Sequence, residues 1–349
     1  MSGGVDSAVA AWLLKQAGYE VIGLTLKTWQ SEGGEESRCC EIGDARRAAL
    51  KIGIPCYVQN CVTEFISKVS GPFMEEYLSG RTPNPCILCN PLIKWEGLLA
   101  FADLMHAEYA ATGHYASVVR MENGRYTVRR GADLSKDQTY MLCRLTQDQL
   151  RRTIMPLGNL TKDEVRKIAK AASLPAASKP DSQEICFVTR GSYTDFIEEY
   201  YEGEIPGEGY FTDEQGKILG KHKGLIHYTV GQRRGLGLSL GEPVYVKRID
   251  PERNEVVVAG RDSLAAGEIL CDRVSCMGIG DLPEEEELSC LCKIRYHHRE
   301  QEASVKKEKN GLLRIRFPQK VSAPAPGQTA VLYDRAGRIL GSGIIRESF

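Results

Sequence analysis

Three clusters of residues in this sequence have the types and spacing needed for chemistry on a nucleotide and on sulfur. The first, at residues 2–7, reads Ser-Gly-Gly-Val-Asp-Ser. Its two glycines let backbone N–H groups approach an anion closely, and a helix that follows them would point its positive dipole end at the same place. No lysine follows the glycines, so the cluster is not a Walker A loop. The pattern predicts a phosphate-binding loop, against the alternative of a turn that only caps a helix.

The other two clusters carry cysteines. Residues 82–90 hold Cys86 and Cys89 behind two prolines, and residues 181–187 hold Cys186. We expect a helix to begin at Pro91, which would put Cys89 near a helix N-terminus, where the dipole favours the thiolate. A sulfur relay needs two such thiols, because one carries a terminal persulfide and the other releases it by forming a disulfide.

Other interpretations of these cysteines stay open on the residues alone. Cys86 and Cys89 could form half of a zinc site, with the other half at Cys39-Cys40 or at Cys290-x-Cys292, although neither pair has the usual two-residue spacing. They could form a thioredoxin-type motif, although no strand directly precedes them. Any of them could also be a small buried hydrophobic residue.

The elements that must position these clusters change character along the chain. Helical and strand patterns alternate in the first half, with helices expected at 6–16, 44–51, 62–78, 91–106 and 163–172 and strands at 20–26, 56–59 and 108–112. This alternation predicts an α/β domain with a parallel sheet. A phosphate loop normally follows a strand, so the first strand is expected to be missing from the sequence and to lie upstream of Met1.

From about Gly207 the pattern becomes all-β, with short alternating segments separated by Gly, Pro and Asp turns. It predicts a small β-rich central domain followed by a C-terminal β-barrel. The expected boundaries are residues 1–195 for the α/β domain, 196–265 for the central domain and 266–349 for the barrel.

Composition limits the class of protein. None of the 349 residues falls in an apolar run near the roughly 20 needed to cross a bilayer, and the start is not a secretory signal. We therefore expect no membrane partner and a cytoplasmic location. The formal net charge of −1 means that any nucleic acid would be bound by local basic patches. Twelve cysteines in such a chain favour thiol chemistry over a disulfide framework.

Taken in order, the motifs resemble those of the tRNA-specific 2-thiouridylase family (MnmA/TrmU) from end to end. The matching segments are SGGVDS (2–7), GRTPNPCILCN (80–90), ATGHYA (111–116), KDQTYML (136–142), DSQEICF (181–187), HYTVGQRRGLG (227–237) and APGQTAVLY (325–333). The first of these also resembles the PP-loop of ATP pyrophosphatases, which holds the β- and γ-phosphates while the α-phosphate is attacked. In that setting Asp6 would help to hold Mg²⁺.

The resemblance implies a three-domain enzyme whose first domain is a PP-loop ATP pyrophosphatase domain. ATP would adenylate O2 of the wobble uridine in tRNAs for Lys, Glu and Gln, and a persulfide would then deliver sulfur to C2. Cys89 would be the catalytic nucleophile and Cys186 the persulfide carrier. The residues implied to line the ATP site are Ser2, Gly3, Gly4, Val5, Asp6, Ser7, Leu26 and Gly113.

The implied partner is the anticodon stem-loop of tRNA, with the wobble base turned out of its stack. The residues that would contact tRNA are Asn84, Pro85, Cys86, His114, Lys136, Asp137, Gln138, Arg295, Tyr296 and Gln328. The sulfur donor would be a cysteine desulfurase or a sulfur-relay protein. Because Cys86 stands where many relatives have Asp, Cys86, Cys89 and Cys186 could alternatively ligate a 4Fe–4S cluster with one iron left open.

Two rival functions remain. An amidating synthetase of the PP-loop class would share the phosphate loop but would need neither Cys89 nor Cys186. A non-catalytic RNA-binding protein would bind tRNA through the barrel and would release no AMP from ATP.

Overall fold

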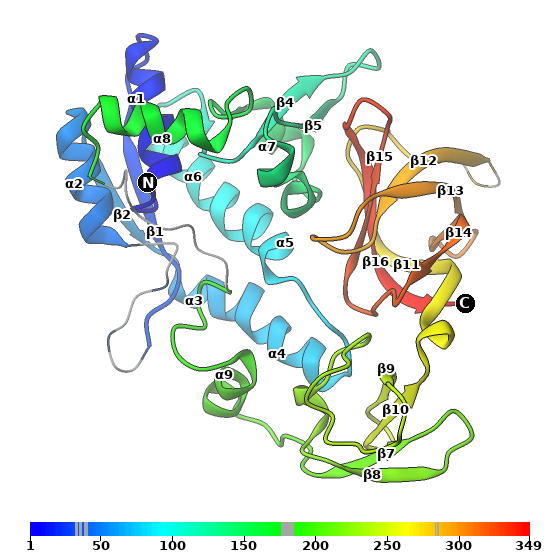
Figure 1. Cartoon of the computed structure of the whole chain (residues 1–349). Coiled ribbons are helices and arrows are strands. Elements are labelled where there is room, and N and C mark those ends of the chain that lie inside the picture. The colour runs from blue at the N-terminus through cyan, green and yellow to red at the C-terminus, as the bar shows by residue number, and fades with distance from the viewer. Residues whose placement is uncertain (32–33, 35–36, 38–40, 176–184, 283, 285) are drawn as a thin grey trace. The chain divides into compact units, whose positions relative to one another are not determined.

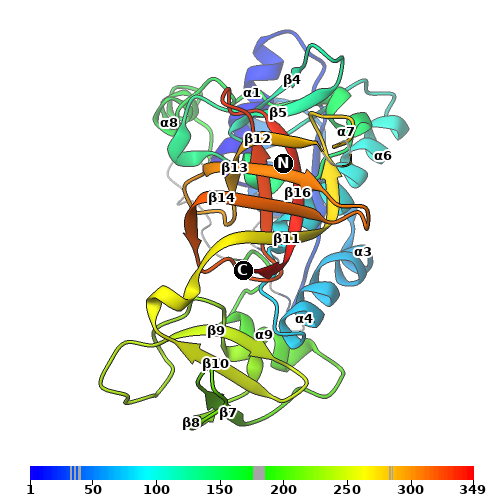
Figure 2. The same ribbon diagram turned by 90° about the vertical axis from the view of Figure 1, so that its right-hand side faces the viewer.

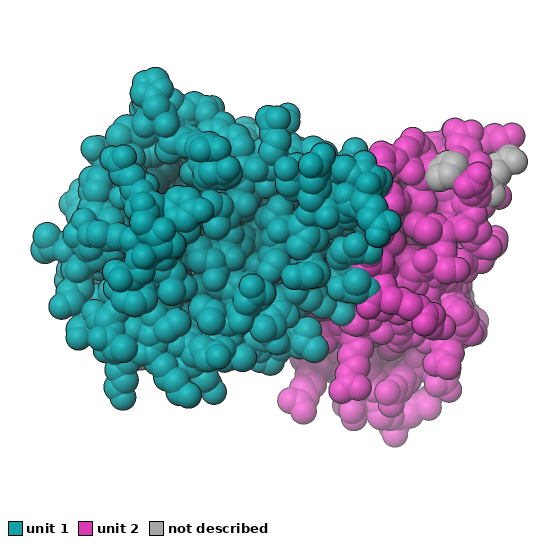
Figure 3. All heavy atoms as spheres, turned by 90° about the horizontal axis from the view of Figure 1, so that it is seen from above, with its two compact units in different colours: residues 1–70, 85–193, 336–339 teal, residues 71–84, 194–335, 340–349 magenta. Residues whose placement is uncertain are grey.

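The computed structural model describes residues 1–31, 34, 37, 41–175, 185–282, 284 and 286–349. These residues form two compact units, which Figure 3 draws in teal and magenta. Unit 1 comprises residues 1–70, 85–193 and 336–339, and unit 2 comprises residues 71–84, 194–335 and 340–349. Within the described part of the chain, no helix has both the length and the apolar character needed to cross a membrane.

Unit 1 is built on parallel strand pairs and the helices around them (Figure 1). Strand β1 (Gly23–Lys27) pairs in parallel with β2 (Cys56–Asn60), and β3 (Ala110–Ala111) pairs in parallel with β6 (Thr153–Ile154). Helix α1 (Val5–Gln16) packs its small buried residues against α2 (Ile42–Ile52) and α8 (Lys162–Ala171). The predicted α/β class is therefore confirmed.

The segment around the first cysteine pair is helical over a longer range than predicted. Helix α5 (Pro85–Cys89) runs into a π-helical stretch, η2 (Asn90–Trp95), and then into α6 (Glu96–Leu104). The prediction that the helix begins at Pro91 is wrong. A proline inside a helix lacks an N–H and crowds the carbonyl four residues before it, and the wider π turn accommodates both effects. Cys89 is thus the fifth residue of its helix, and the first turn holds Cys86 instead.

A second long helical segment also contains a π turn. Helix α3 (Val62–Phe65) continues through η1 (Ile66–Ser70) into α4 (Gly71–Leu78). The first two elements belong to unit 1, whereas α4 belongs to unit 2. The predicted helix over 62–78 is present, but it divides between the two units.

Several elements of unit 1 were not predicted. Strands β4 (Ala116–Arg120) and β5 (Tyr126–Arg130) form a hairpin, on which the Ala336–Ile339 turn docks. There the Arg130 N–H donates to the carbonyl of Gly337 at 3.1 Å, and the Thr127 hydroxyl donates to the carbonyl of Ile339 at 2.6 Å. The remaining short helices are η3 (Leu134–Lys136), η4 (Thr139–Leu142) and α7 (Gln147–Arg151).

Unit 2 contains the two predicted β modules (Figure 2). The first is a sheet in the order β8-β7-β10-β9, formed by β7 (Gly209–Thr212), β8 (Ile218–His222), β9 (Tyr245–Asp250) and β10 (Glu255–Ala259). Helix α9 (Tyr193–Tyr200) precedes it, η5 (Leu225–His227) follows β8, and η6 (Arg261–Leu264) leads into the second module.

The second module is a closed barrel in the order β11-β14-β13-β12-β15-β16, which confirms the predicted barrel. Its strands are β11 (Ala265–Cys276), β12 (Glu287–Lys293), β13 (Gln301–Lys307), β14 (Leu313–Ser322), β15 (Thr329–Tyr333) and β16 (Ile339–Ser348). The barrel also anchors the chain after α4, because the Thr82 N–H donates to the carbonyl of Pro326 at 2.8 Å.

Candidate active site

Residues 2–7 form a hydroxyl-lined loop at the start of α1. The Ser2 and Ser7 hydroxyl oxygens lie 3.0 Å apart, and the Ser7 hydroxyl donates to the carbonyl of Gly4 at 3.1 Å. Gly3 has a φ of +81°, and a Cβ there would lie 2.8 Å from the carbonyl oxygen of Glu41. Only glycine fits this position without moving the backbone.

Gly113 lies directly against this loop. It follows β3, and a Cβ at this residue would lie 2.7 Å from the carbonyl carbon of Asp6 and 2.8 Å from the backbone nitrogen of Ser7. Residues 2–7 and Gly113, all predicted to line the ATP site, therefore come together. Leu26 lies on β1, and its side chain faces Gly97 of α6. A Cβ added at Gly97 would lie 3.1 Å from Cδ2 of Leu26.

The carboxylate of Asp6 is held by two side chains that the sequence did not single out. The Lys162 ammonium donates to both of its oxygens, at 2.9 and 2.8 Å, and the Tyr115 hydroxyl donates to one of them at 2.6 Å. Lys162 is 7% exposed. A capping box of Thr161 and Glu164 fixes the start of α8 and so places Lys162. That Thr-x-x-Glu pattern was the only sequence signal for its position.

Part of the KDQTYML segment (136–142) holds Tyr115, whose hydroxyl contacts Asp6 in the loop at residues 2–7. The Gln138 side-chain oxygen accepts a hydrogen bond from the Tyr115 N–H at 2.9 Å. Asp137 is buried, accepts from the Thr139 N–H and hydroxyl, and lies 3.5 Å from the Arg130 guanidinium. The predicted tRNA contacts Asp137 and Gln138 thus have structural partners, and Lys136 lies half-buried on η3 beside them.

His114 lies between the loop and the cysteine helix. Its Nδ1 is 2.9 Å from the Thr112 hydroxyl, and its ring lies 5.6 Å from that of Trp95 in η2. Desolvation lowers the pKa of His114 to about 3, and the positive charge of Lys94 adds to this effect. The imidazole is therefore neutral at pH 7, so one ring nitrogen can donate a hydrogen bond and the other can accept one.

Helix α5 presents its two cysteines three residues apart, on one face. Cys86 is half-buried, and Cys89 is 5% exposed. The Asn90 amide donates to the carbonyl of Met141 at 2.7 Å, which ties this helix to η4 just after Gln138. The Met141 N–H in turn donates to the carbonyl of Gln138 at 3.1 Å, so hydrogen bonds through Asn90, Met141, Gln138 and Tyr115 connect the cysteine helix to the loop at residues 2–7.

Cys186 is anchored through the residue that follows it. Phe187 is 1% exposed and packs edge-on against the Phe65 ring, with the ring centroids 5.3 Å apart. Phe65 ends α3, and η1 continues from it and packs against α5. The Cys186 segment and the Cys89 helix thus rest on the same helical stretch (Figure 1). Residues 181–184 and Cys39-Cys40 lie outside the described residues.

The described residues do not gather three or more His, Cys, Asp or Glu side chains in an arrangement that could hold a metal ion. Cys290 and Cys292, once considered for a zinc site, lie on β12 of the barrel. Burial raises the pKa of Cys290 to about 12 and also raises that of Cys292. These two thiols are therefore protonated at neutral pH.

The remaining predicted tRNA residues fall in two places. Pro85 begins α5 in unit 1, whereas Asn84, Arg295, Tyr296 and Gln328 belong to unit 2. The Gln328 amide donates to the carbonyl of Thr82 at 2.7 Å, so it holds the segment that leads to Asn84. The Tyr296 ring lies under the Lys293 ammonium, 5.6 Å from its centroid.

Three family models match successive parts of the chain. They are described as a tRNA methyl transferase HUP domain over residues 1–190, a tRNA methyl transferase PRC-barrel domain over 194–260 and an aminomethyltransferase β-barrel domain over 271–345. A HUP domain with a glycine-rich loop at its first helix, followed by two β modules, defines a class of nucleotide-binding proteins associated with tRNA.

Relatives along the whole chain narrow this class. Proteins named tRNA-specific 2-thiouridylase MnmA are 46% identical in Lachnoclostridium phytofermentans and 44% identical in Clostridioides difficile, covering 99% and 100% of this chain and 98% and 97% of theirs. A third, from Caldanaerobacter subterraneus, is 49% identical over 99% of this chain and 96% of its own. The chain belongs to the tRNA-specific 2-thiouridylase family, and this membership implies that it binds ATP.

Among solved structures, the chain shares 19% identity with the U34-tRNA thiolase NcsA from Methanococcus maripaludis, which carries a [4Fe–4S] cluster. The TM-score is 0.34, over 57% of this chain and 61% of that one. A TM-score this low does not establish a shared fold.

Proposed function

We propose that this chain is a tRNA-uridine 2-sulfurtransferase that uses ATP to place a sulfur atom on C2 of the wobble uridine. Full-length relatives with this activity in their names support the proposal. The structural observation that carries it is the chain of hydrogen bonds from Asp6 of the loop at residues 2–7, through Tyr115, Gln138, Met141 and Asn90, to the helical segment that bears Cys89. A nucleotide on the loop and a thiol on the helix would be held by one set of contacts.

The first half of the reaction is adenylation. Uridine O2 attacks the α-phosphorus of ATP, the bond to the bridging oxygen breaks, and pyrophosphate leaves. Backbone N–H groups of residues 2–7 and the Ser2 and Ser7 hydroxyls would hold the phosphates, with the start of α1 directed at them. Lys162 is paired with Asp6, and this ion pair would hold the start of α1 in place as the phosphates bind.

The second half of the reaction moves sulfur. The terminal sulfur of a persulfide on Cys186 attacks C2, and AMP leaves with its oxygen. The Cys89 thiolate then attacks the Sγ of Cys186, which forms a Cys89–Cys186 disulfide and leaves the transferred sulfur on C2. An external thiol reductant must restore both cysteines before the next turnover.

Mg²⁺ is expected to accompany the phosphates of ATP, and we test its fit at Asp6. Both carboxylate oxygens already accept hydrogen bonds from Lys162, and one also accepts from Tyr115. Direct ligation of Mg²⁺ by Asp6 does not fit this arrangement. For a 4Fe–4S cluster, Cys86 and Cys89 share one helix face, but the described residues gather no three such side chains that could hold a metal ion in this arrangement.

The tRNA anticodon stem-loop is the proposed substrate. Asn84, Pro85 and Cys86 would face the target base, and His114, Lys136, Tyr296 and Gln328 would lie along the RNA. Asp137, Gln138 and Arg295 would act mainly by holding neighbouring backbone. We further propose the domain boundaries 1–195, 196–265 and 266–349, and a persulfide-donating cysteine desulfurase or relay protein as the partner.

Reconstitution tests the proposal. Purified protein, ATP, unmodified tRNA and a persulfide donor should yield 2-thiouridine, with AMP and pyrophosphate released only when tRNA is present. Cys89→Ser and Cys186→Ser should abolish the thiolated nucleoside, and Cys56→Ser, a half-buried thiol on β2, serves as the control. An amidating synthetase would keep its activity in the Cys186 variant, and an RNA-binding protein would release no AMP.

A further inference from the structure

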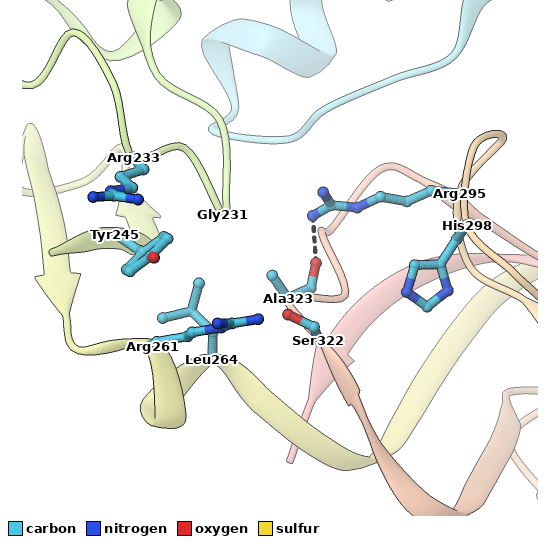
Figure 4. Close-up of a pocket in the computed structure, with 9 residues that line it drawn as sticks. All are labelled: Gly231, Arg233, Tyr245, Arg261, Leu264, Arg295, His298, Ser322 and Ala323. Atoms are coloured by element: carbon cyan, nitrogen blue, oxygen red, sulfur yellow. Dashed lines mark hydrogen bonds between the residues drawn. The ribbon is translucent and has the colours of Figure 1, made fainter. Parts of the chain in front are cut away.

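Unit 2 contains a basic pocket where the central sheet meets the barrel (Figure 4). Its volume is about 480 Å³. Arg233 enters it from the loop before β9, Tyr245 from the start of β9 and Arg261 from η6. The barrel supplies the opposite wall. The side chains that matter for its chemistry are those of Arg233, Tyr245, Arg261, Arg295, His298 and Ser322.

The pocket carries positive charge that is not neutralised locally. Among the described residues that line it, none carries a carboxylate. Arg233 and Arg261 are exposed and make no ion pair within the described ranges of the chain. Other arginines of unit 2 do, since Arg248 pairs with Asp250 and Arg316 pairs with Glu268. Arginine without a protein carboxylate is suited to bind phosphate, because its planar fork of donors matches two phosphate oxygens.

Arg295 holds two segments of the pocket wall together. Its guanidinium donates to the carbonyl of Val230 at 3.0 Å and to the carbonyl of Ala323, which joins the loop before β9 to the end of β14. Gly231 makes this joint possible, because a Cβ there would already lie 3.1 Å from the Ala323 methyl group. Arg295 is therefore a positioning residue that holds the loop on which Arg233 is carried.

We propose that this pocket binds phosphate groups of the tRNA backbone through Arg233 and Arg261, with the Tyr245 and Ser322 hydroxyls as additional donors. The inference rests on the proposed function, since it names a second contact for the same substrate. Two exposed arginines attract a single small anion weakly, because water and salt screen the charges. A polyanion gains more, since each neutralised phosphate releases condensed counterions.

The test measures tRNA affinity across a series of salt concentrations by filter binding. The variants are Arg233→Ala/Arg261→Ala and a matched control, Arg253→Ala, which removes an exposed arginine from the turn between β9 and β10. The double variant should bind tRNA about 10-fold more weakly, and its log–log salt slope should fall by about 0.7–0.9 for each arginine removed. The control should match the wild type, and all three should show the same thermal melting.

Three results would overturn the proposal. The first is wild-type affinity and slope in the double variant. The second is an equal loss of affinity in the Arg253 control. The third is calorimetric binding of inorganic phosphate that the double variant loses while its tRNA binding is unchanged, since the site would then serve a free anion. Thiolation by the wild type is measured separately. A protein that binds tRNA at this pocket but does not thiolate it would contradict the proposed function without contradicting the proposed phosphate site.

Discussion

Gly113→Ala is the most direct perturbation of the phosphate loop. The added methyl group would lie 2.7 Å from the carbonyl carbon of Asp6 and 2.8 Å from both its oxygen and the Ser7 nitrogen. All three are backbone atoms, so no side-chain rotation can relieve the contact. Ordinary van der Waals contact begins at 3.4 Å, and the two backbones must separate by about 0.7 Å.

That displacement sets the expected magnitude. Ser7 N–H is one of the groups available to a bound phosphate, and a shift approaching 1 Å at a positioning group can cost about 100-fold in rate. We expect kcat/KM for ATP to fall about 10- to 100-fold. Overpacking of this kind also costs about 1–3 kcal/mol of stability.

The assay is tRNA-dependent release of pyrophosphate at varied ATP, with melting measured alongside. Gly260→Ala is the matched control, because its φ is −65° and a Cβ there meets nothing within 4 Å. The control should retain wild-type rates. Wild-type kcat/KM in Gly113→Ala would refute the placement of Gly113 against a nucleotide-binding loop.

Three further predictions concern charge and junctions. Lys162→Met should destabilise the fold by up to about 3 kcal/mol in urea titration, because it leaves the partly buried Asp6 carboxylate without its cation. Adding Asp6→Asn should restore much of the lost stability, and a double variant that stays equally unstable would contradict the pairing. Burial lowers the pKa of His222, so the unfolded chain binds a proton at this residue more readily than the folded chain does. The contribution of His222 to the free energy of unfolding should therefore be complete above pH 6.5 and decrease as the pH falls below that value. His222→Gln should flatten this pH dependence of the unfolding free energy, and an unchanged slope would contradict the assignment. Arg295→Lys should lower the melting temperature of unit 2 in calorimetry, since a lysine cannot reproduce the fork across two carbonyls, and an unchanged transition would argue against that role.

The elements that sequence predicted well have strong local signals. The glycine pair before α1, the left-handed Gly53 that ends α2 and the alternating β segments of the barrel are all of this kind. The start of the cysteine helix was misplaced because Pro91 is typical of a first helical position, whereas the π turn that tolerates it leaves no sequence signature. The hairpin at β4 and β5 depends on the distant Ala336–Ile339 turn, which no local pattern reveals.

The same division applies to the site. The loop and the cysteines could be found from residue types, because their chemistry is specific. Lys162 could not, since a lysine in the first turn of an amphipathic helix usually faces solvent, and only the packing of α8 on α1 turns it toward Asp6. The contact of Gln138 with Tyr115 could not be predicted either, since it joins residues that are 23 positions apart in the sequence. Long-range contacts, rather than local propensity, decide both cases.

In the proposed reaction Cys186 delivers sulfur and Cys89 releases it. Mass spectrometry of the protein after a single turnover tests this most directly, starting from Cys186 persulfide with ATP and tRNA and with no reductant. We expect one Cys89–Cys186 disulfide for each 2-thiouridine formed. Formation of 2-thiouridine with both thiols still reduced, or by the Cys186→Ser variant, would contradict it.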